Sequence, residues 1–99
     1  MTRDIFLSTL SQQSPPKEAS AILRALWLER QNQWEEAHEV VQDVDSSIAA
    51  AVHAYLHRKE GDLWNANYWY RTAGRKPFTG SLDDEWQALV TEECKNLDR

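Results

Sequence analysis

The feature of this sequence that most constrains its fold is an apolar pattern that occurs twice, 29 residues apart. Its members lie three or four positions apart, which is the spacing of one face of an α-helix. The first copy is Trp34, Ala37, Val41 and Val44, and the second is Leu63, Ala66, Tyr70 and Ala73. The same displacement carries the polar break at Asn32 onto the break at Gly61. We therefore expect two helix-turn-helix units of one architecture.

The expected units cover residues 19–45 and 48–75, because an apolar run precedes each copy of the pattern and predicts the first helix of its unit. A short helix over residues 3–12 is expected to cap the N-terminal end. A last helix over residues 81–97 begins after Ser81, a favourable N-cap residue, and is expected to close the other end of the stack.

Composition favours an all-α fold in a single domain over residues 1–99. A chain of 99 residues is long enough for one hydrophobic core but hardly for two. Five Trp, three Tyr and two Phe supply large buried areas, whereas three Gly and three Pro are too few for the many turns of a sandwich or barrel. The expected architecture is a stack of antiparallel helical hairpins with N- and C-terminal capping helices.

The formal net charge of -5 argues against nucleic-acid binding, because affinity for phosphate backbones rests on clustered Lys and Arg. The charge is unevenly distributed along the chain. Residues 53–76 hold five Lys and Arg against two acids, a local charge of +3, which leaves -8 for the remainder. This distribution suits protein partners of either sign.

Cysteine usage and the N-terminal segment indicate the compartment. Cys94 is the only cysteine, so no internal disulfide can form and a reducing cytoplasm is expected. Residues 1–16 lack the long apolar core and the small-residue cleavage site of a signal peptide. No segment approaches transmembrane length, and we expect no membrane association.

No catalytic motif, phosphate-cradling glycine loop or cofactor motif is found in the sequence. Cys94 lies beside Glu92 and Glu93, and these acids disfavour the thiolate that a nucleophile requires. We therefore expect a protein that is not an enzyme and that uses no cofactor.

The second unit resembles the tetratricopeptide repeat in its pattern of small and aromatic residues. The pattern is Gly61-Asp62-Leu63-x-x-Ala66-x-x-x-Tyr70-x-x-Ala73, with Ala54 seven residues before the glycine. The first unit matches more loosely, with Asn32 in the glycine position, Val41 in the aromatic position and Val44 in the last alanine position. The 29-residue period is shorter than the family's period of about 34 residues. The resemblance covers about residues 19–75 and implies helical hairpins stacked side by side.

The resemblance also implies a peptide- or protein-binding groove lined by the first helix of each hairpin. In this sequence the lining positions include Ile22, Leu26, Ala51, Tyr55 and Arg58. The segment 53–75 is also similar to a family of short, uncharacterised bacterial proteins, and this similarity carries no activity. We expect a protein-interaction or adaptor module that binds a protein or peptide, with self-association as a possible part of its role.

Trp64 and Tyr68 are singled out because the 29-residue displacement maps them from the acids Glu35 and Glu39. We expect the apolar face of the C-terminal helix to pack over the two aromatics, as caps do in repeat stacks. If that helix misses them, the exposed aromatics form an interface for a second copy or a protein partner.

His53 and His57 lie four residues apart on one predicted helix, and Glu60 follows three residues later. The spacing fits a metal, but it lacks the Glu after the first His of a helical metalloprotease motif. A solvated or hydrogen-bonded histidine pair is the favoured interpretation, so no metal is predicted. The alternative to an adaptor is a small-ligand or metal-binding domain that uses His53, His57, Tyr55 and Arg58.

The remaining candidate residues are a third histidine and a group of basic residues. His38 maps onto Asn67 in the second unit and adds little to the histidine pair. Basic residues interleaved with tyrosines could recognise a carboxylate or phosphate, but we favour pairing with Glu60, Asp62 or the acids of the last helix. These basic residues are Arg58, Lys59, Arg71, Arg75 and Lys76.

Overall fold

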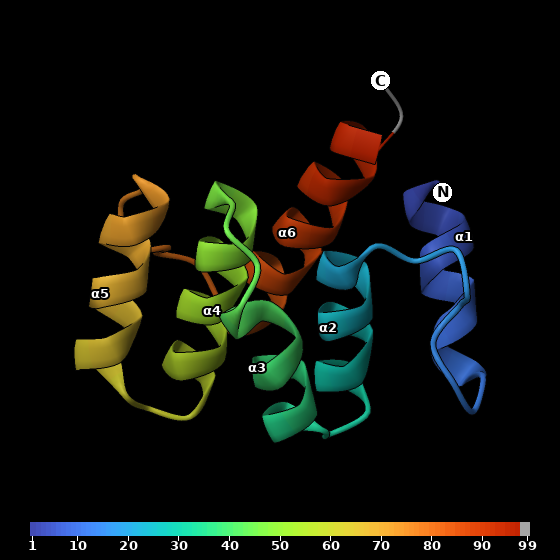
Figure 1. Cartoon of the computed structure of the whole chain (residues 1–99), viewed down its shortest axis with the longest axis horizontal. Helices are drawn as coiled ribbons and strands as arrows, with labels where there is room; N and C mark the ends of the chain where they lie inside the picture. The colour runs from blue at the N-terminus through green and yellow to red at the C-terminus, as the bar shows by residue number, and fades with distance from the viewer. Residues whose placement is uncertain (98–99) are drawn as a thin grey trace.

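A computed structural model describes residues 1–97, which form six α-helices and one short 3-10 turn (Figure 1). The elements are α1 (Arg3–Ser8), η1 (Thr9–Ser11), α2 (Ala21–Arg30), α3 (Trp34–Gln42), α4 (Ser47–Lys59), α5 (Leu63–Ala73) and α6 (Leu82–Leu97). These residues contain no strand, so the all-α prediction is confirmed. None of the described helices is long and apolar enough to cross a membrane.

The chain forms two helical hairpins, α2 with α3 and α4 with α5, and α3 packs against α4 between them. The two hairpin turns have the same geometry. Asn32 has a φ of +62° and Gly61 a φ of +86°, both in the left-handed region that ends a helix sharply. In both turns the amide of the following residue donates to the carbonyl five residues before it, at 3.0 Å in the first and 2.9 Å in the second. The 29-residue displacement therefore corresponds to a repeated turn.

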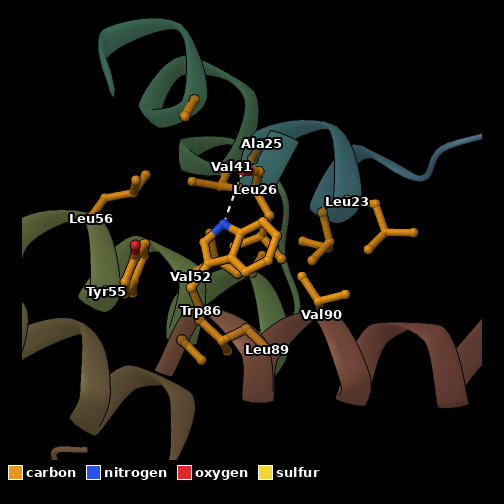
Figure 2. Packing of buried hydrophobic residues seen from close by; sticks show 14 of the residues in the cluster. Leu23, Ala25, Leu26, Val41, Val52, Tyr55, Leu56, Trp86, Leu89 and Val90 are labelled. Atoms are coloured by element: carbon orange, nitrogen blue, oxygen red, sulfur yellow. Dashed lines mark hydrogen bonds between the residues drawn. The ribbon is translucent and has the colours of Figure 1, made fainter. Parts of the chain in front are cut away.

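Helix α6 lies across α2 and α4, and its apolar face forms part of the main core (Figure 1). Trp86 is fully buried, and its indole Nε1 donates to the carbonyl of Leu26 on α2 at 3.0 Å (Figure 2). Val52 of α4 and Leu89 of α6 belong to the same cluster. The expectation that the C-terminal helix closes the end of the stack was wrong, because its largest apolar side chain packs between the two hairpins.

Helix α1 and its 3-10 turn lie on the side of the molecule opposite α5 (Figure 1). Phe6 is fully buried, with its ring centroid 6.1 Å from that of Trp86. The turn is held by Trp27, whose indole donates to the carbonyl of Thr9 at 3.1 Å. A helix is thus present within the predicted residues 3–12, although only Arg3–Ser8 are α-helical, and it covers the core beside α6.

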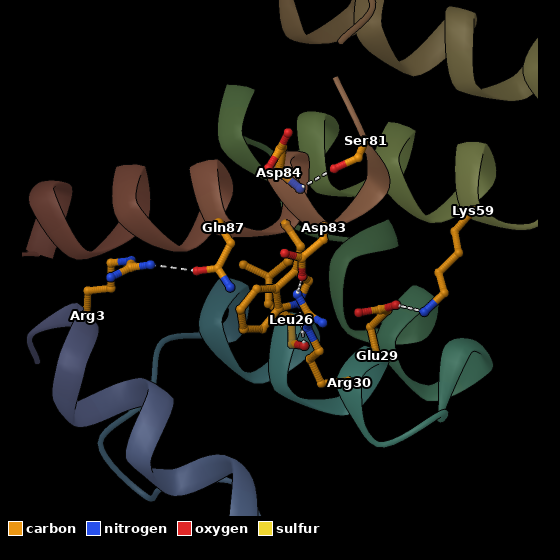
Figure 3. A network of polar contacts seen from close by, with 10 residues as sticks. Arg3, Leu26, Glu29, Arg30, Lys59, Ser81, Asp83, Asp84 and Gln87 are labelled. Carbon is orange, nitrogen blue, oxygen red and sulfur yellow. Dashed lines mark hydrogen bonds and ion pairs between the residues drawn. The ribbon is translucent and has the colours of Figure 1, made fainter. Parts of the chain in front are cut away.

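Polar contacts bind the flank of α6 to the helices beneath it (Figure 3). Arg3 of α1 donates to Gln87 at 2.8 Å. Arg30 of α2 pairs with Asp83, and its guanidinium lies 3.9 Å from the centroid of the Trp86 ring. The guanidinium of Arg30 thus covers the buried indole, and the two contacts join α6 to α1 and α2.

Candidate functional site

The groove that the tetratricopeptide resemblance implies is filled by α6 of the same chain. The four apolar positions predicted to line it are all buried, at 4 % exposed or less: Ile22, Leu26, Ala51 and Tyr55. The fifth, Arg58, donates through Nη1 to Oε1 of Glu85 on α6 at 2.8 Å. Of these predicted partner-binding residues, Tyr55 is therefore buried within the chain, whereas Arg58 keeps 22 % of its side chain exposed and is held by α6.

Buried carboxylates hold this seam together. The side chain of Glu85 is 4 % exposed and accepts hydrogen bonds from Arg58 and from the hydroxyl of Tyr70. Burial is the main cause that raises the pKa of Tyr70, and the nearby Glu85 raises it further. This phenol therefore stays protonated and donates its hydrogen bond. Burial is likewise the main cause that raises the pKa of Tyr55, and the nearby Glu29 adds to the effect. The seam between α4 and α6 is thus polar, and Glu85 is paired within it by Arg58 and Tyr70.

A pocket of about 240 Å³ lies between α4, α6 and the loop over residues 74–81. Its charged lining is already paired. Arg75 makes two bonds to Glu92, at 2.7 and 2.6 Å, and Glu92 raises the pKa of Arg75. Glu85 is engaged by Arg58 and Tyr70 as described above. The pocket therefore presents no unpaired charged lining group beyond the exposed Lys76.

Among the basic residues of segment 53–76, Arg58 and Arg75 pair with acids of the last helix as expected. Lys59 instead pairs with Glu29 of α2, which was not among the expected partners. Arg71 and Lys76 are exposed to solvent. The three paired cations are used to join helices, and no cluster of cations converges on one point.

The outer face of α5 carries exposed aromatic side chains. Trp64 is 75 % exposed, Tyr68 is 45 % exposed and the neighbouring Leu63 is 62 % exposed. The expectation that the C-terminal helix covers Trp64 and Tyr68 was wrong. The physical reason is that the apolar face of α6 is already buried on α2 and α4, with Trp86 at its centre.

Equivalent residues on α3 and α5, which lie 29 positions apart in the sequence, differ in whether another helix covers them. On α3, Trp34 donates from Nε1 to the carbonyl of Leu56 at 2.7 Å, and so contacts the next helix, α4. The residue in the same place on α5 is Leu63, which is exposed because no helix in residues 1–97 packs there as α4 packs on α3. The face of α5 is therefore an open end of the pair of hairpins.

A histidine cluster lies at the junction of α3, α4 and α5. His38 of α3 and His53 of α4 bring their Nε2 atoms to 2.9 Å, and Nδ1 of His57 lies 2.8 Å from Oε1 of Glu60. One ligand atom from each of the three histidines lies within 4.8 Å of the others. The structure thus brings together the predicted His53, His57 and Glu60, and it adds His38, which was not expected to contribute.

The environment of His38 and His53 favours their neutral form. The pKa of His53 is lowered to about 4, mainly by burial and further by the nearby His38 and His57. Burial also lowers the pKa of His38. His53 stacks on Trp69 of α5 with ring centroids 3.8 Å apart. Trp34, which stacks on His38, and Trp69 therefore form the aromatic sides of the cluster.

The four residues of the small-ligand alternative do not form one site. Tyr55 and Arg58 face α2 and α6, whereas His53 and His57 lie against residues of α3 and α5. Cys94, the one thiol of the sequence, is 4 % exposed in the core and is not placed to attack a substrate.

Comparisons of the chain with known protein families, with curated proteins and with solved structures found no match. The tetratricopeptide resemblance and the similarity to short bacterial proteins therefore stay predictions. The two candidate regions are the open face of α5 and the histidine cluster.

Proposed function

We propose that this protein is a protein-interaction module and that its contact surface is the α5 face, which we define as Leu63, Trp64, Tyr68 and Arg71. The observation that carries the proposal is the exposure of Trp64, at 75 %, beside Tyr68 at 45 %. Large aromatic side chains dominate the binding energy of protein interfaces when a partner buries them. The same positions on α3 hold exposed Glu35 and Glu39, so aromatic residues are not a requirement of the hairpin itself.

The occupant that fits this surface is a helix of a partner protein, packed on α5 as α4 packs on α3. Support comes from the matching turns of the two hairpins and from Leu63, which takes the place of Trp34 but has no helix over it. Arg71 is exposed seven residues after Trp64, two helical turns along the same face. A partner helix with apolar side chains and an acidic residue at its edge complements this pattern.

The test places a photo-crosslinking benzoylphenylalanine at position 64 in one variant and at the displaced control position 35 in another. Both variants are expressed in the source cells, and crosslinked proteins are identified by mass spectrometry. The partner is then purified, and its Kd is measured with the parent chain and with Trp64→Ala/Tyr68→Ala. We expect a crosslinked partner at position 64 alone and a Kd raised at least about 10-fold in the double variant.

The control for the binding step is Glu35→Ala/Glu39→Ala, which changes the equivalent exposed positions of the first hairpin and leaves the Kd within about twofold. Equal crosslinking at positions 35 and 64, or a Kd that the aromatic substitutions do not change, refutes the α5 face. A crosslink to a second copy of this chain refutes the separate partner and assigns self-association instead.

A further inference from the structure

We propose that His38, His53 and His57 form a zinc-binding site in which Glu60 positions His57. These are all three histidines of the chain, and α3 supplies one of them and α4 the other two. Each offers a ligand nitrogen within 4.8 Å of the other two. Imidazole nitrogen is a preferred ligand of Zn²⁺, and three histidines are a sufficient protein donor set. The site is independent of the α5 face proposed above.

The spacing of the two closest nitrogens fits a shared metal. Nε2 of His38 and Nε2 of His53 are 2.9 Å apart. Two nitrogens bound to tetrahedral zinc at about 2.0 Å lie about 3.3 Å from each other, so a displacement of a few tenths of an ångström accommodates the ion. Without an ion, one Nε2 must carry a hydrogen and donate it to the other, so only one of these two Nε2 atoms has a lone pair.

His57 has the arrangement of a metal ligand oriented by a carboxylate. Its Nδ1 lies 2.8 Å from Oε1 of Glu60, and in the neutral ring Nδ1–H donates to this carboxylate. The lone pair is then on Nε2, which is the nitrogen left to bind an ion. Metal-bound histidines commonly donate their second nitrogen to a carboxylate, which fixes the tautomer and the orientation of the ring.

The rings are also fixed from the sides. Trp34 stacks on His38 with an interplanar angle of 12° and centroids 5.1 Å apart. Trp69 stacks on His53 at 13° and 3.8 Å. Ligands held in place by packing need little rearrangement when the ion binds. His38 is half-buried whereas His53 and His57 are buried, so an ion has access from the His38 side and the fourth coordination position remains for water.

The lowered pKa values of His38 and His53 agree with this geometry, because only a neutral imidazole has a lone pair to offer. A bound ion would join α3 of the first hairpin to α4 of the second. The ion therefore has a structural consequence besides its coordination, which is to tighten the contact between the two hairpins.

The experiment uses the full chain without a histidine tag, freed of metal with a chelator. Zn²⁺ titration is followed by calorimetry and by the melting temperature, and Co²⁺ is used as a spectroscopic probe of tetrahedral coordination. We expect one equivalent to bind, a zinc-dependent rise in the melting temperature and the absorption bands of tetrahedral Co²⁺. The absence of a zinc-dependent rise, or of any binding heat, overturns the proposal.

Substitutions then assign the ligands. His38→Gln, at the half-buried position, leaves the fold intact by circular dichroism and lowers zinc affinity at least about 100-fold, whereas Glu60→Gln lowers it about 10-fold and keeps the tetrahedral Co²⁺ spectrum. The matched control is Glu39→Gln, an exposed acid next to His38, with affinity within about twofold. Unchanged zinc affinity in His38→Gln overturns the three-histidine site and points to His57, Glu60 and Asp62, which also lie close enough together to hold an ion.

Discussion

Replacement of Trp86 by alanine tests whether α6 belongs to the core rather than to the edge of the fold. The side chain is fully buried among residues of α2, α4 and α6, and its indole donates to the carbonyl of Leu26. Truncation of a buried Trp costs about 3–5 kcal/mol, and the lost hydrogen bond adds about 1 kcal/mol. We expect the free energy of unfolding to fall by about 4–6 kcal/mol in Trp86→Ala.

The assay is urea denaturation followed by far-ultraviolet circular dichroism. With an m-value of about 1.5 kcal/mol per molar urea, the expected loss lowers the midpoint by roughly 3–4 M. Since a small domain has about 5–15 kcal/mol in total, Trp86→Phe is measured as well and is expected to lose about 2 kcal/mol. Trp64→Ala is the matched control, because Trp64 is 75 % exposed and its loss changes stability by less than about 0.5 kcal/mol. A loss below about 2 kcal/mol in Trp86→Ala, or equal losses at positions 64 and 86, refutes the reasoning.

Three further predictions concern the seam, the turns and the histidines. Arg58→Ala leaves the buried carboxylate of Glu85 without its cation and is expected to cost about 3–5 kcal/mol in urea denaturation, whereas alanine at the exposed Lys76 changes little. Gly61→Ala is expected to cost about 1 kcal/mol in thermal denaturation because of its φ of +86°, and Asn32→Gly to be neutral or stabilising; a destabilised Asn32→Gly contradicts this account. Because His53 has a pKa of about 4 when folded and about 6.5 when unfolded, the unfolded chain binds the proton first, so stability is full above about pH 6.5 and falls as pH decreases toward 4. His53→Phe removes this part of the pH dependence, and identical pH profiles of the two proteins contradict it.

Local patterns in the sequence predict the helices well because each helix needs only its own residues to define its apolar face and its ends. The two hairpin turns are an example. Asn32 and Gly61 lie 29 residues apart in the sequence, and both adopt the left-handed backbone conformation. The position of α6 is different. Its apolar stripe around Trp86 shows that the helix must be covered, but the stripe fits a capping position and a groove equally well.

The candidate sites depend on which helices meet, and the sequence predicts this only in part. The pairing of His53 with His57 follows from one helical turn, and it was predicted. The role of His38 depends on the packing of α3 against α4, which no spacing within one helix reveals. A usable signal was present, because His38 lies four residues after Trp34 and therefore on the side of α3 that approaches α4.

The place of α6 has a consequence for how the chain unfolds. In a linear array of hairpins each member contacts only its neighbours, and the terminal members fray independently. Here the bond from Trp86 to Leu26 spans 60 residues of sequence, and α6 packs on the first and second hairpins at once. The loss of either hairpin would expose the apolar face of α6 to water, so partly unfolded forms are disfavoured. A chain of two hairpins thereby gains cooperative, all-or-none unfolding that side-by-side stacking alone does not provide.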